Sequence, residues 1–378
     1  MAMHNKKEKR VREPLFHIVK RDQLPFHKSF LIRGIAILAA LIFAGVVTIF
    51  MTGDNPISVY ATMFEGAFGS SLRIWVTFQE IAMLLCVALA VTPAFKMRFW
   101  NIGAEGQVLI GGLVTAICMF YIGDSIPTWA LILIMTVTSI LAGAIWGIIP
   151  AIFKAKWGTN ETLFTLMMNY VAIQSIEIFL KIADKSGSNT VGPSLLAHGW
   201  FPALFGQQYL LNILIAALLT VLVWGYMKYT KHGYEISVVG ESENTALYVG
   251  INVKKVIIRT MAISGAICGI VGLLLVGGTS HSIDSNIADG RGFTAIMVSW
   301  LAKFNPFVMV LVSALLMVLS RGAEEVSSRF GLNPSFADIV TGIILFFIIG
   351  CEFFIQYKVQ TNRGHRLFRG LKKKQEVN

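Results

Sequence analysis

Residues 129–151, WALILIMTVTSILAGAIWGIIPA, decide the fold class, because these 23 residues contain no charged side chain. A helix needs about 20 mostly apolar residues to cross the roughly 30 Å hydrocarbon layer of a bilayer. Comparable apolar runs recur along most of the chain. The sequence therefore predicts an all-α polytopic membrane protein.

The composition agrees with this interpretation. The 378 residues have a mean hydropathy of +0.67, 55% are hydrophobic and 14% are charged, whereas soluble domains carry about 25% charged residues. The net charge of +11 comes from basic residues in the two ends and a few short loops, without a basic face interleaved with aromatic residues. We therefore expect membrane lipids as neighbours and no nucleic-acid partner.

Hydropathy predicts about ten transmembrane helices. The two spans at 290–302 and 307–320 are short enough to be half-helices. The predicted spans are 31–51, 73–95, 103–122, 129–151, 162–183, 209–228, 257–278, 290–302, 307–320 and 336–356.

Positive charge orients these helices. Loops that stay in the cytoplasm are enriched in Lys and Arg. With the N-terminus inside, all but six of the 32 Lys and Arg residues fall in predicted cytoplasmic segments. The exceptions are Arg73, Lys181, Lys185, Arg291, Arg321 and Arg329. We therefore expect a protein of the cytoplasmic membrane with both termini in the cytoplasm.

This threading divides the chain into three regions. Residues 1–30 form a basic cytoplasmic arm, residues 31–356 form the transmembrane domain, and residues 357–378 form a basic cytoplasmic tail. The longest internal loop covers 229–256, and the largest outer loop, 184–208, is a candidate surface for an external partner. The four cysteines lie inside apolar runs without CxxC spacing, which favours packing over metal binding.

Polar residues at membrane depth mark the candidate pathway, because ionisable groups in lipid cost about 3 kcal/mol unless they face protein or water. The segment Asn101-Ile102-Gly103-Ala104-Glu105-Gly106-Gln107 is the richest in such groups. Its glycines indicate an unwound helix end, which is tolerated where it lines a cavity or is buried in protein. The alternative is an ordinary cytoplasmic turn capped by Asn101, with Glu105 near a helix N-terminus.

A second polar stripe follows Asn160. Glu161, Thr165 and Asn169 are spaced four residues apart and therefore share one helix face. This face either lines the pathway or makes interhelical hydrogen bonds. Glu80 is a further candidate for the same cavity.

One outer connection is a candidate metal site. It contains His281, Asp284 and Asp289, but their spacing matches no common ligand pattern. We expect no metal and no cofactor.

The loop at 229–256 predicts a short cytoplasmic helix. Residues Asn244 to Val249 can form it, with Ser242 as N-cap and Gly250 as terminator. Such a helix suits contact with a soluble motor, and the alternative is a solvated connector.

Four motifs resemble the membrane permeases of ABC importers in the branched-chain amino acid and simple-sugar superfamily, in particular the purine-nucleoside permeases associated with basic membrane lipoproteins. They are NIGAEGQVLIGG from Asn101, NETLFTLMMNY from Asn160, GESENTALYVGINV from Gly240 and GRGFTAIMVSWLAKFNP from Gly290. Together they cover about 60 residues, and their order runs through most of residues 70–350.

The resemblance implies a type II importer architecture with two permease subunits around a central pathway, the second one non-identical. It implies cytoplasmic ATPases that dock on a coupling loop and an extracellular lipoprotein that delivers nucleosides. It also implies that Asn101, Glu105 and Gln107 line the pathway. The residues that it assigns to the coupling loop are Gly240, Glu241, Asn244, Ala246, Tyr248 and Gly250.

The chain itself is not expected to be an enzyme. It contains no Gly-Lys dipeptide, so the phosphate-binding GxxxxGK[ST] loop of ATPases is absent. Simple sugars or other small polar solutes are the alternative cargo. The rival transport mechanism is a proton-coupled secondary carrier that would use Glu80, Glu105 or Glu161.

Overall fold

The computed structural model describes residues 16–21, 25–53, 55–184, 189–333 and 335–361. These residues fall into two compact units, and each unit is described by itself. One contains residues 60–329, and the other joins the two ends of the chain, residues 1–59 and 330–378.

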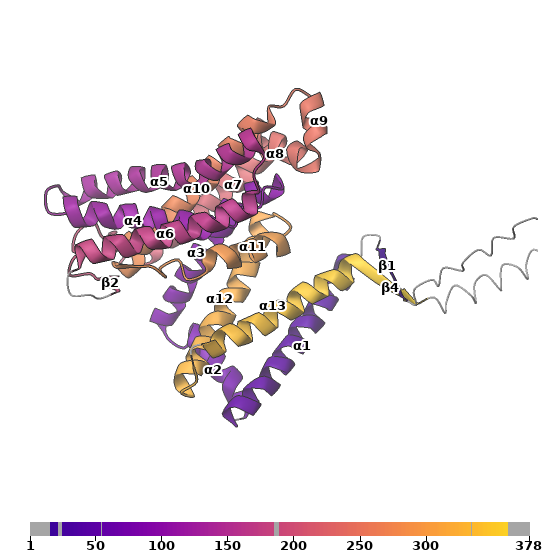
Figure 1. The fold of residues 1–378 in the computed structure, drawn as a ribbon. Helices are drawn as coiled ribbons and strands as arrows, with labels where there is room; N and C mark the ends of the chain where they lie inside the picture. Colours follow the sequence, from indigo (N-terminus) through magenta and orange to yellow (C-terminus); the bar gives the residue numbers. More distant parts are fainter. Residues whose placement is uncertain (1–15, 22–24, 54, 185–188, 334, 362–378) are drawn as a thin grey trace, which may run out of the picture. The chain divides into compact units, whose positions relative to one another are not determined.

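Residues 60–329 form a helical bundle (Figure 1). Its long helices are α3 (Ser71–Lys96), α4 (Ala104–Ile122), α5 (Thr128–Trp157), α6 (Glu161–Ala183), α7 (Leu210–Tyr229), α10 (Val253–Leu275) and α12 (Pro306–Arg329). Its shorter elements are α8 (Lys231–Glu241), α9 (Glu243–Tyr248), the π-helical turn η1 (Val276–Ser280) and α11 (Arg291–Leu301). Two short strands, β2 (Thr190–Val191) and β3 (Ile283–Asp284), pair antiparallel, and α2 (Pro56–Phe68) links the two units.

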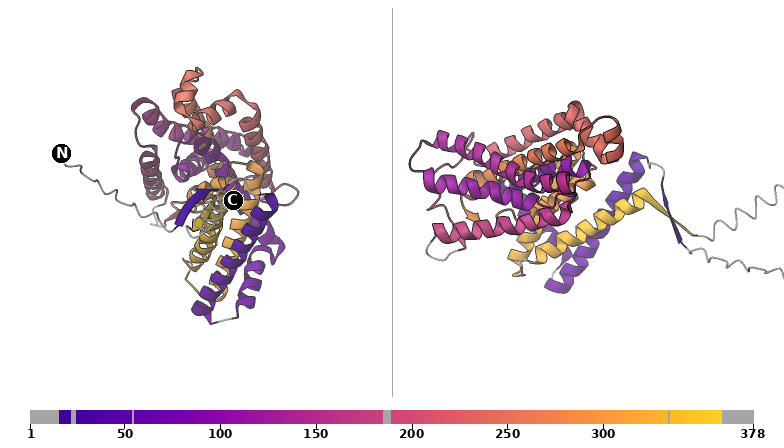
Figure 2. Two further views of the ribbon diagram at one scale, coloured as in Figure 1. Left: turned by 90° about the vertical axis from the view of Figure 1, so that its right-hand side faces the viewer. Right: turned by 45° about the horizontal axis from the view of Figure 1, so that its top comes forward.

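The other unit consists of two antiparallel helices, α1 (Phe26–Thr52) and α13 (Ser335–Gln356), which lie side by side (Figure 2). Arg33 bonds to Glu352 at 3.0 Å, and the rings of Phe43 and Phe347 are 5.8 Å apart. The strands β1 (Phe16–Lys20) and β4 (Tyr357–Thr361) pair antiparallel beyond these helices. The start of α1 and the end of α13 therefore lie at the same end of the unit.

Close approach of glycines holds the centre of the large unit together. A Cβ atom at Gly143 of α5 would collide with the carbonyl of Gly265 of α10, and one at Gly111 of α4 would lie 2.6 Å from the Cα of Gly269. Small residues permit such backbone contacts, which are a main source of helix association in lipid. The GxxxG pairs Gly143/Gly147 of α5 and Gly265/Gly269 of α10, together with Gly111 of α4, therefore serve the packing of α5 and α4 against α10.

The prediction of an all-α polytopic membrane protein is confirmed. Nine helices in the described part of the chain are long and apolar enough to span a membrane. Of the alternatives predicted for 290–302, the structure has the half-helix rather than a full span, because α11 has only 11 residues. The short span predicted at 307–320 is instead the 24-residue helix α12.

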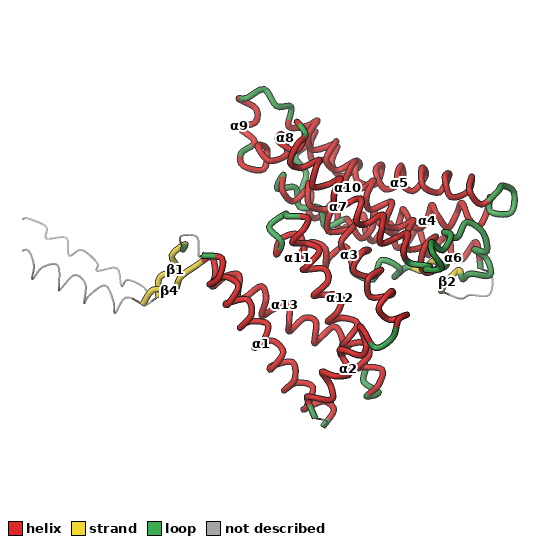
Figure 3. The backbone as a smooth tube through the Cα atoms, turned by 180° about the vertical axis from the view of Figure 1, so that it is seen from behind, coloured by secondary structure: helices red, strands yellow, loops and turns green. Residues whose placement is uncertain are grey.

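The segment before α11 completes an interrupted passage through the bundle. At one end β3 pairs with β2, which follows α6, and at the other end Trp300 packs against Phe95 near the end of α3. Figure 3 shows this passage between α10 and α12, with α8 and α9 at one end of the bundle and β2 at the other. Apolar content alone reveals only the helical half of such a passage.

Most of the predicted arm at 1–30 and tail at 357–378 lies outside the described residues. The loop predicted at 229–256 contains α9 at the expected place, because the Ser242 hydroxyl accepts the amide of Thr245 at 3.2 Å and Gly250 has φ +82°. The sequence interpretation missed α8, which the Thr230 hydroxyl caps by accepting the amide of Gly233.

Candidate functional site

The segment 97–103 is non-helical, in agreement with the predicted unwound helix end; Met97, Phe99, Asn101 and Gly103 are buried, whereas Arg98 and Trp100 are exposed. Asn101 is fully buried, and its side chain accepts the amide of Gly103 at 3.1 Å and donates to the Ser264 hydroxyl at 3.3 Å. The Gln107 amide donates to the Asn101 oxygen at 3.4 Å. Asn101 thus satisfies one backbone amide of the non-helical segment, and Gln107 and Ser264 hold its carboxamide in place.

Helix α6 holds the same segment from the other side. Asn169 accepts the amide of Gly106 at 2.9 Å and donates to the carbonyl of Ile102 at 3.0 Å, and the Thr165 hydroxyl accepts the Ile102 amide at 3.2 Å. Both polar side chains are buried. The predicted stripe on α6 therefore makes the interhelical hydrogen bonds that were its alternative interpretation.

Glu105, at the start of α4, caps another helix. Its two carboxylate oxygens accept the backbone amides of Gly290 at 2.9 Å and Gly292 at 2.6 Å, at the N-terminus of α11. A Cβ atom at position 292 would collide with the backbone nitrogen of Glu105. The free amides and positive dipole end of a helix N-terminus favour a carboxylate at this place.

This junction includes the start of α4, which is long and apolar enough to span a membrane. Trp300 packs on Phe95 near the end of α3, and Gly292 lies about 12 Å from Trp300 along the axis of α11, since a helix rises about 1.5 Å per residue. Two interrupted passages, 97–103 before α4 and 285–290 before α11, therefore meet at Glu105. Non-helical backbone at such depth must be buried in protein or face water.

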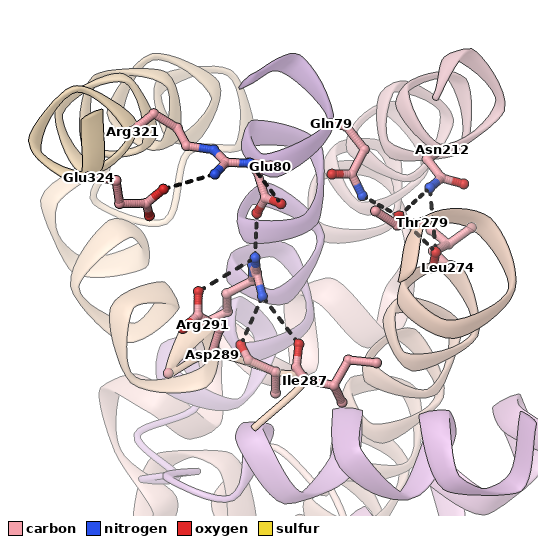
Figure 4. A network of polar contacts seen from close by, with 12 residues as sticks. Gln79, Glu80, Asn212, Leu274, Thr279, Ile287, Asp289, Arg291, Arg321 and Glu324 are labelled. Carbon is pink, nitrogen blue, oxygen red and sulfur yellow. Dashed lines mark hydrogen bonds and ion pairs between the residues drawn. The ribbon is translucent and has the colours of Figure 1, made fainter. Parts of the chain in front are cut away.

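Glu80 lies beside this junction in an ionic network (Figure 4). Its carboxylate bonds to the Arg291 guanidinium and lies 3.8 Å from that of Arg321. Arg291 also donates to the carbonyls of Ile287 and Ala288. The network ties α3 to the start of α11 and to α12.

The neighbouring residue on α3, Gln79, faces a different cluster. Its amide donates to the Thr279 hydroxyl at 2.5 Å, and Asn212 of α7 donates to the same hydroxyl at 3.1 Å (Figure 4). Thr279 and Asn212 both donate to the carbonyl of Leu274. Glu80 thus contacts α11 and α12, whereas Gln79 contacts η1, which Asn212 joins to α7.

Glu161 is separate from the junction. It forms an ion pair at 2.7 Å with Lys154 near the end of α5. The structure thus brings Asn101, Glu105, Gln107, Thr165 and Asn169 together, with Glu80 adjacent through Arg291. In this structure these five side chains are buried and bonded within the protein, and pathway lining by the predicted residues stays a prediction.

Arg291 and its flanking glycines were missed as site residues by the sequence interpretation. The available signal was an arginine between Gly290 and Gly292 in an apolar segment, because a charged residue at membrane depth requires a partner. The carboxylates of Glu105 and Glu80, which bond to Gly290 and Arg291, lie more than 180 residues earlier in the chain. The spacing of residues in the sequence cannot reveal such pairs.

The predicted coupling loop forms the helical pair α8–α9. Gly240 packs directly on the carbonyl of Lys96, the last residue of α3. Ala246 is buried, whereas Tyr248 is 92% exposed and Glu241, Asn244 and Gly250 lie on the surface. A groove of about 690 Å³ separates α9 from the end of α5 and is lined by Lys154, Gly158, Glu243, Leu247 and Lys254 among others.

The residues weighed as metal ligands have other partners. The His281 ring stacks on Trp200 and bonds to Gln208 at 3.1 Å, and Asp289 lies 3.7 Å from Arg291. Asp284 accepts the amide of Asn286. Among the residues with described positions, no group of three His, Cys, Asp or Glu side chains could hold a metal ion.

Comparison with known proteins gives the family. Residues 72–349 match the model of the branched-chain amino acid transport system / permease component family. Among curated proteins, guanosine ABC transporter permease protein NupP of Bacillus subtilis is 30% identical over 83% of this chain and 91% of its own length. Guanosine ABC transporter permease protein NupQ of the same organism is 25% identical, over 71% and 86% of the two chains.

A sugar transporter is also similar. Glucose ABC transporter permease protein TsgB13 of Haloferax volcanii is 28% identical over 86% of this chain and 88% of its own length. The family match covers the helices that build the junction at Glu105 and the pair α8–α9. The chain belongs to the branched-chain amino acid transport system / permease component family and is a multi-pass membrane permease of the ABC transporter type.

Proposed function

We propose that this chain is one of two permease subunits of an ABC importer and translocates nucleosides across the cytoplasmic membrane. Two relatives whose names specify guanosine support nucleosides as the cargo. Neutral hydrogen-bonding groups such as those of Asn101 and Asn169 suit a ribose or a purine. The relative named for glucose makes simple sugars the second candidate cargo.

The observation that carries this proposal is the pair α8–α9 at the end of the bundle where α3 and α5 end. Leu247, Tyr248 and Val249 are 60%, 92% and 62% exposed. These three residues form an apolar knob on an otherwise polar loop. Apolar and aromatic residues that stand exposed in this way mark protein interfaces. A cytoplasmic ATPase that binds this knob would move α8, and with it the end of α3, through the contact between Gly240 and Lys96.

The second permease is non-identical in this proposal. One organism has two guanosine permease proteins, NupP and NupQ, and this chain is similar to both. Cargo would arrive from an extracellular substrate-binding lipoprotein at the opposite end of the bundle, where the paired strands β2 and β3 lie. ATP hydrolysis belongs to the ATPase subunits.

Both termini lie in the cytoplasm in this proposal. The pairing of β1 with β4 supports a common side. Nine complete spans alone would put the termini on opposite sides, and the interrupted passage through 285–301 supplies the tenth crossing. The abundance of Lys and Arg at both ends makes that side the cytoplasm.

The test is gentle affinity purification of the tagged chain from its native membrane, followed by transport in vesicles. We expect an ATPase, a second permease and a lipoprotein to co-purify and nucleoside uptake to require ATP. Isolation of the chain alone, with uptake driven by a proton gradient, would contradict the proposal and favour the secondary carrier.

A matched pair of variants tests the docking surface. Tyr248→Ala is expected to release the ATPase, because it removes the most exposed side chain of the knob. Tyr121→Ala, with 61% exposure at the other end of α4, is the control and should retain the ATPase. Equal ATPase recovery with both variants would exclude the knob as the docking site.

A further inference from the structure

Helix α11 exposes one face. Phe293 and Trp300 are seven residues apart and therefore lie on the same side of the helix, and Asp289 directly precedes the N-cap residue Gly290. Phe293 is 45% and Trp300 is 47% exposed, whereas Ala295 and Val298, between them in sequence, are completely buried. This face runs from the junction at Glu105 toward the end of α3.

The exposed carboxylate of Asp289 argues for water or protein rather than lipid on this face. The side chain of Asp289 is 66% exposed and lies 3.7 Å from the Arg291 guanidinium, and its neighbour Gly290 bonds to the buried carboxylate of Glu105. A carboxylate at this depth costs several kcal/mol in lipid unless it borders water or protein. The backbone at Asp289 and Gly290 is also non-helical, with φ of +51° and +67°, and lipid-facing backbone of this kind does not occur.

The lower end of the same face carries two stacked indoles. The rings of Trp300 and Trp100 are 5.7 Å apart with an interplanar angle of 25°, and Trp100 is 46% exposed. The buried ring of Phe95 lies edge-on to both of them, at 5.7 Å from Trp100 and 6.3 Å from Trp300. The indoles therefore form a supported aromatic platform with large areas open to an occupant.

We propose that the α11 face lines the translocation pathway and that the Trp100–Trp300 platform binds the planar base of a nucleoside in transit. This inference rests on the proposed function and names the part of the cargo that is recognised. Indole rings stack on any heteroaromatic base, because every base has a π-face. Asp289 offers acceptor oxygens to the N–H and O–H donors of a base or ribose that approaches from the junction.

Base stacking accounts for the platform better than sugar binding does. A free sugar can contact an indole only through the C–H groups of its puckered ring, whereas a purine offers a flat π-face comparable in size to an indole. The platform therefore favours nucleosides over simple sugars through the base and leaves the ribose to hydrogen-bonding groups.

Transport by the reconstituted complex tests the platform. Trp300→Leu keeps an apolar side chain but removes the ring, and we expect KM for a purine nucleoside to rise about tenfold while uptake of free ribose, where the wild type has any, stays unchanged. Trp300→Phe keeps a ring and should remain within threefold of the wild type. Trp129→Leu, at a 72% exposed tryptophan at the start of α5, is the control and should have no effect.

Thiol labelling tests the face independently of transport. The four native cysteines are buried, so a water-soluble maleimide should react in vesicles with Phe293→Cys and spare Leu141→Cys, a 54% exposed position on α5. A purine nucleoside should slow the labelling of Phe293→Cys. Equal reactivity of the two positions, or labelling that the nucleoside leaves unchanged, would overturn the proposal.

Two further outcomes also overturn it. If Trp300→Leu releases the second permease and Phe293→Cys resists labelling in the intact complex, the face is an interface between subunits. If Trp300→Leu changes nucleoside and ribose uptake equally, the indoles only support the fold. A wild-type complex that transports sugars but no nucleoside refutes the proposed function itself, and this result is obtained before any variant is compared.

Discussion

Replacement of Glu105 by alanine tests the central claim about the junction, that one carboxylate from α4 holds the N-terminus of α11. The carboxylate accepts the amides of Gly290 and Gly292, and a hydrogen bond to a charged group contributes about 1.5–3 kcal/mol. Loss of both bonds removes about 3–6 kcal/mol of local stabilisation and leaves two buried amides without acceptors. Glu105→Gln keeps one acceptor oxygen, and we expect about half of that loss.

Hydrogen–deuterium exchange measured by mass spectrometry on the intact complex reads this effect directly. A change of 1.4 kcal/mol corresponds to a factor of ten, so the peptide with Gly290 and Gly292 should exchange about 100-fold faster or more in Glu105→Ala. The same peptide should exchange roughly tenfold to 100-fold faster in Glu105→Gln. Glu243→Gln, at an exposed position on α9, should leave it unchanged.

An unchanged exchange rate in Glu105→Ala would refute this role of the carboxylate. If Glu105→Ala leaves exchange of this peptide within twofold of the wild type, while the complex remains assembled, the carboxylate does not hold α11. The contacts between α11 and α3 would then suffice to keep the helix in place, and the two interrupted passages would move independently.

Three further predictions concern packing, coupling and pH. Gly143→Leu should prevent recovery of folded protein, since its side chain would collide with the backbone of Gly265, and the yield of monodisperse protein measures this. Gly240→Val should keep the ATPase bound but reduce ATP-driven uptake at least tenfold, because the side chain would push α8 away from the carbonyl of Lys96. Burial lowers the pKa of His232 on α8 below its ordinary value of 6.5, so the unfolded state takes up its proton first and α8 should lose stability as the pH falls from about 6.5 toward this lowered pKa. His232→Gln should weaken this acid sensitivity, as measured by exchange of the α8 peptide between pH 7 and pH 5.

Hydropathy predicted the long helices closely because a span leaves a local signal. The predicted span 209–228 is helix α7 at Leu210–Tyr229, and the predicted span 162–183 is helix α6 at Glu161–Ala183. Each helix satisfies its own backbone, so about 20 apolar residues are sufficient evidence. The segment 290–302 failed this test because α11 is short and relies on Glu105, far away in sequence, to satisfy its first amides.

The candidate site shows the same division between local and distant information. The glycines and polar groups of 101–107 indicated an unwound segment, and the structure has one. The sequence could not show that Asn169 would bond to Gly106, or that Glu80 would bond to Arg291. These pairs are set by the packing of helices that are distant in sequence. No spacing of residues within a single sequence reveals them.

A chain of contacts also connects the helix pair α8–α9, where an ATPase would bind, to helix α11. Gly240 joins α8 to Lys96, the residue at which α3 ends and the segment 97–103 begins. Within that segment Trp100 stacks on Trp300 at one end of α11, and beyond it Glu105 caps the other end of α11. A displacement of α8 therefore reaches both ends of α11 through one short, non-helical stretch of chain. Because that stretch lacks its own helical hydrogen bonds, it can change conformation without breaking a helix, whereas the part of α3 that precedes it, residues 82–95, is buried throughout. We therefore infer that the segment 97–103 is the hinge between the coupling helices and the pathway face.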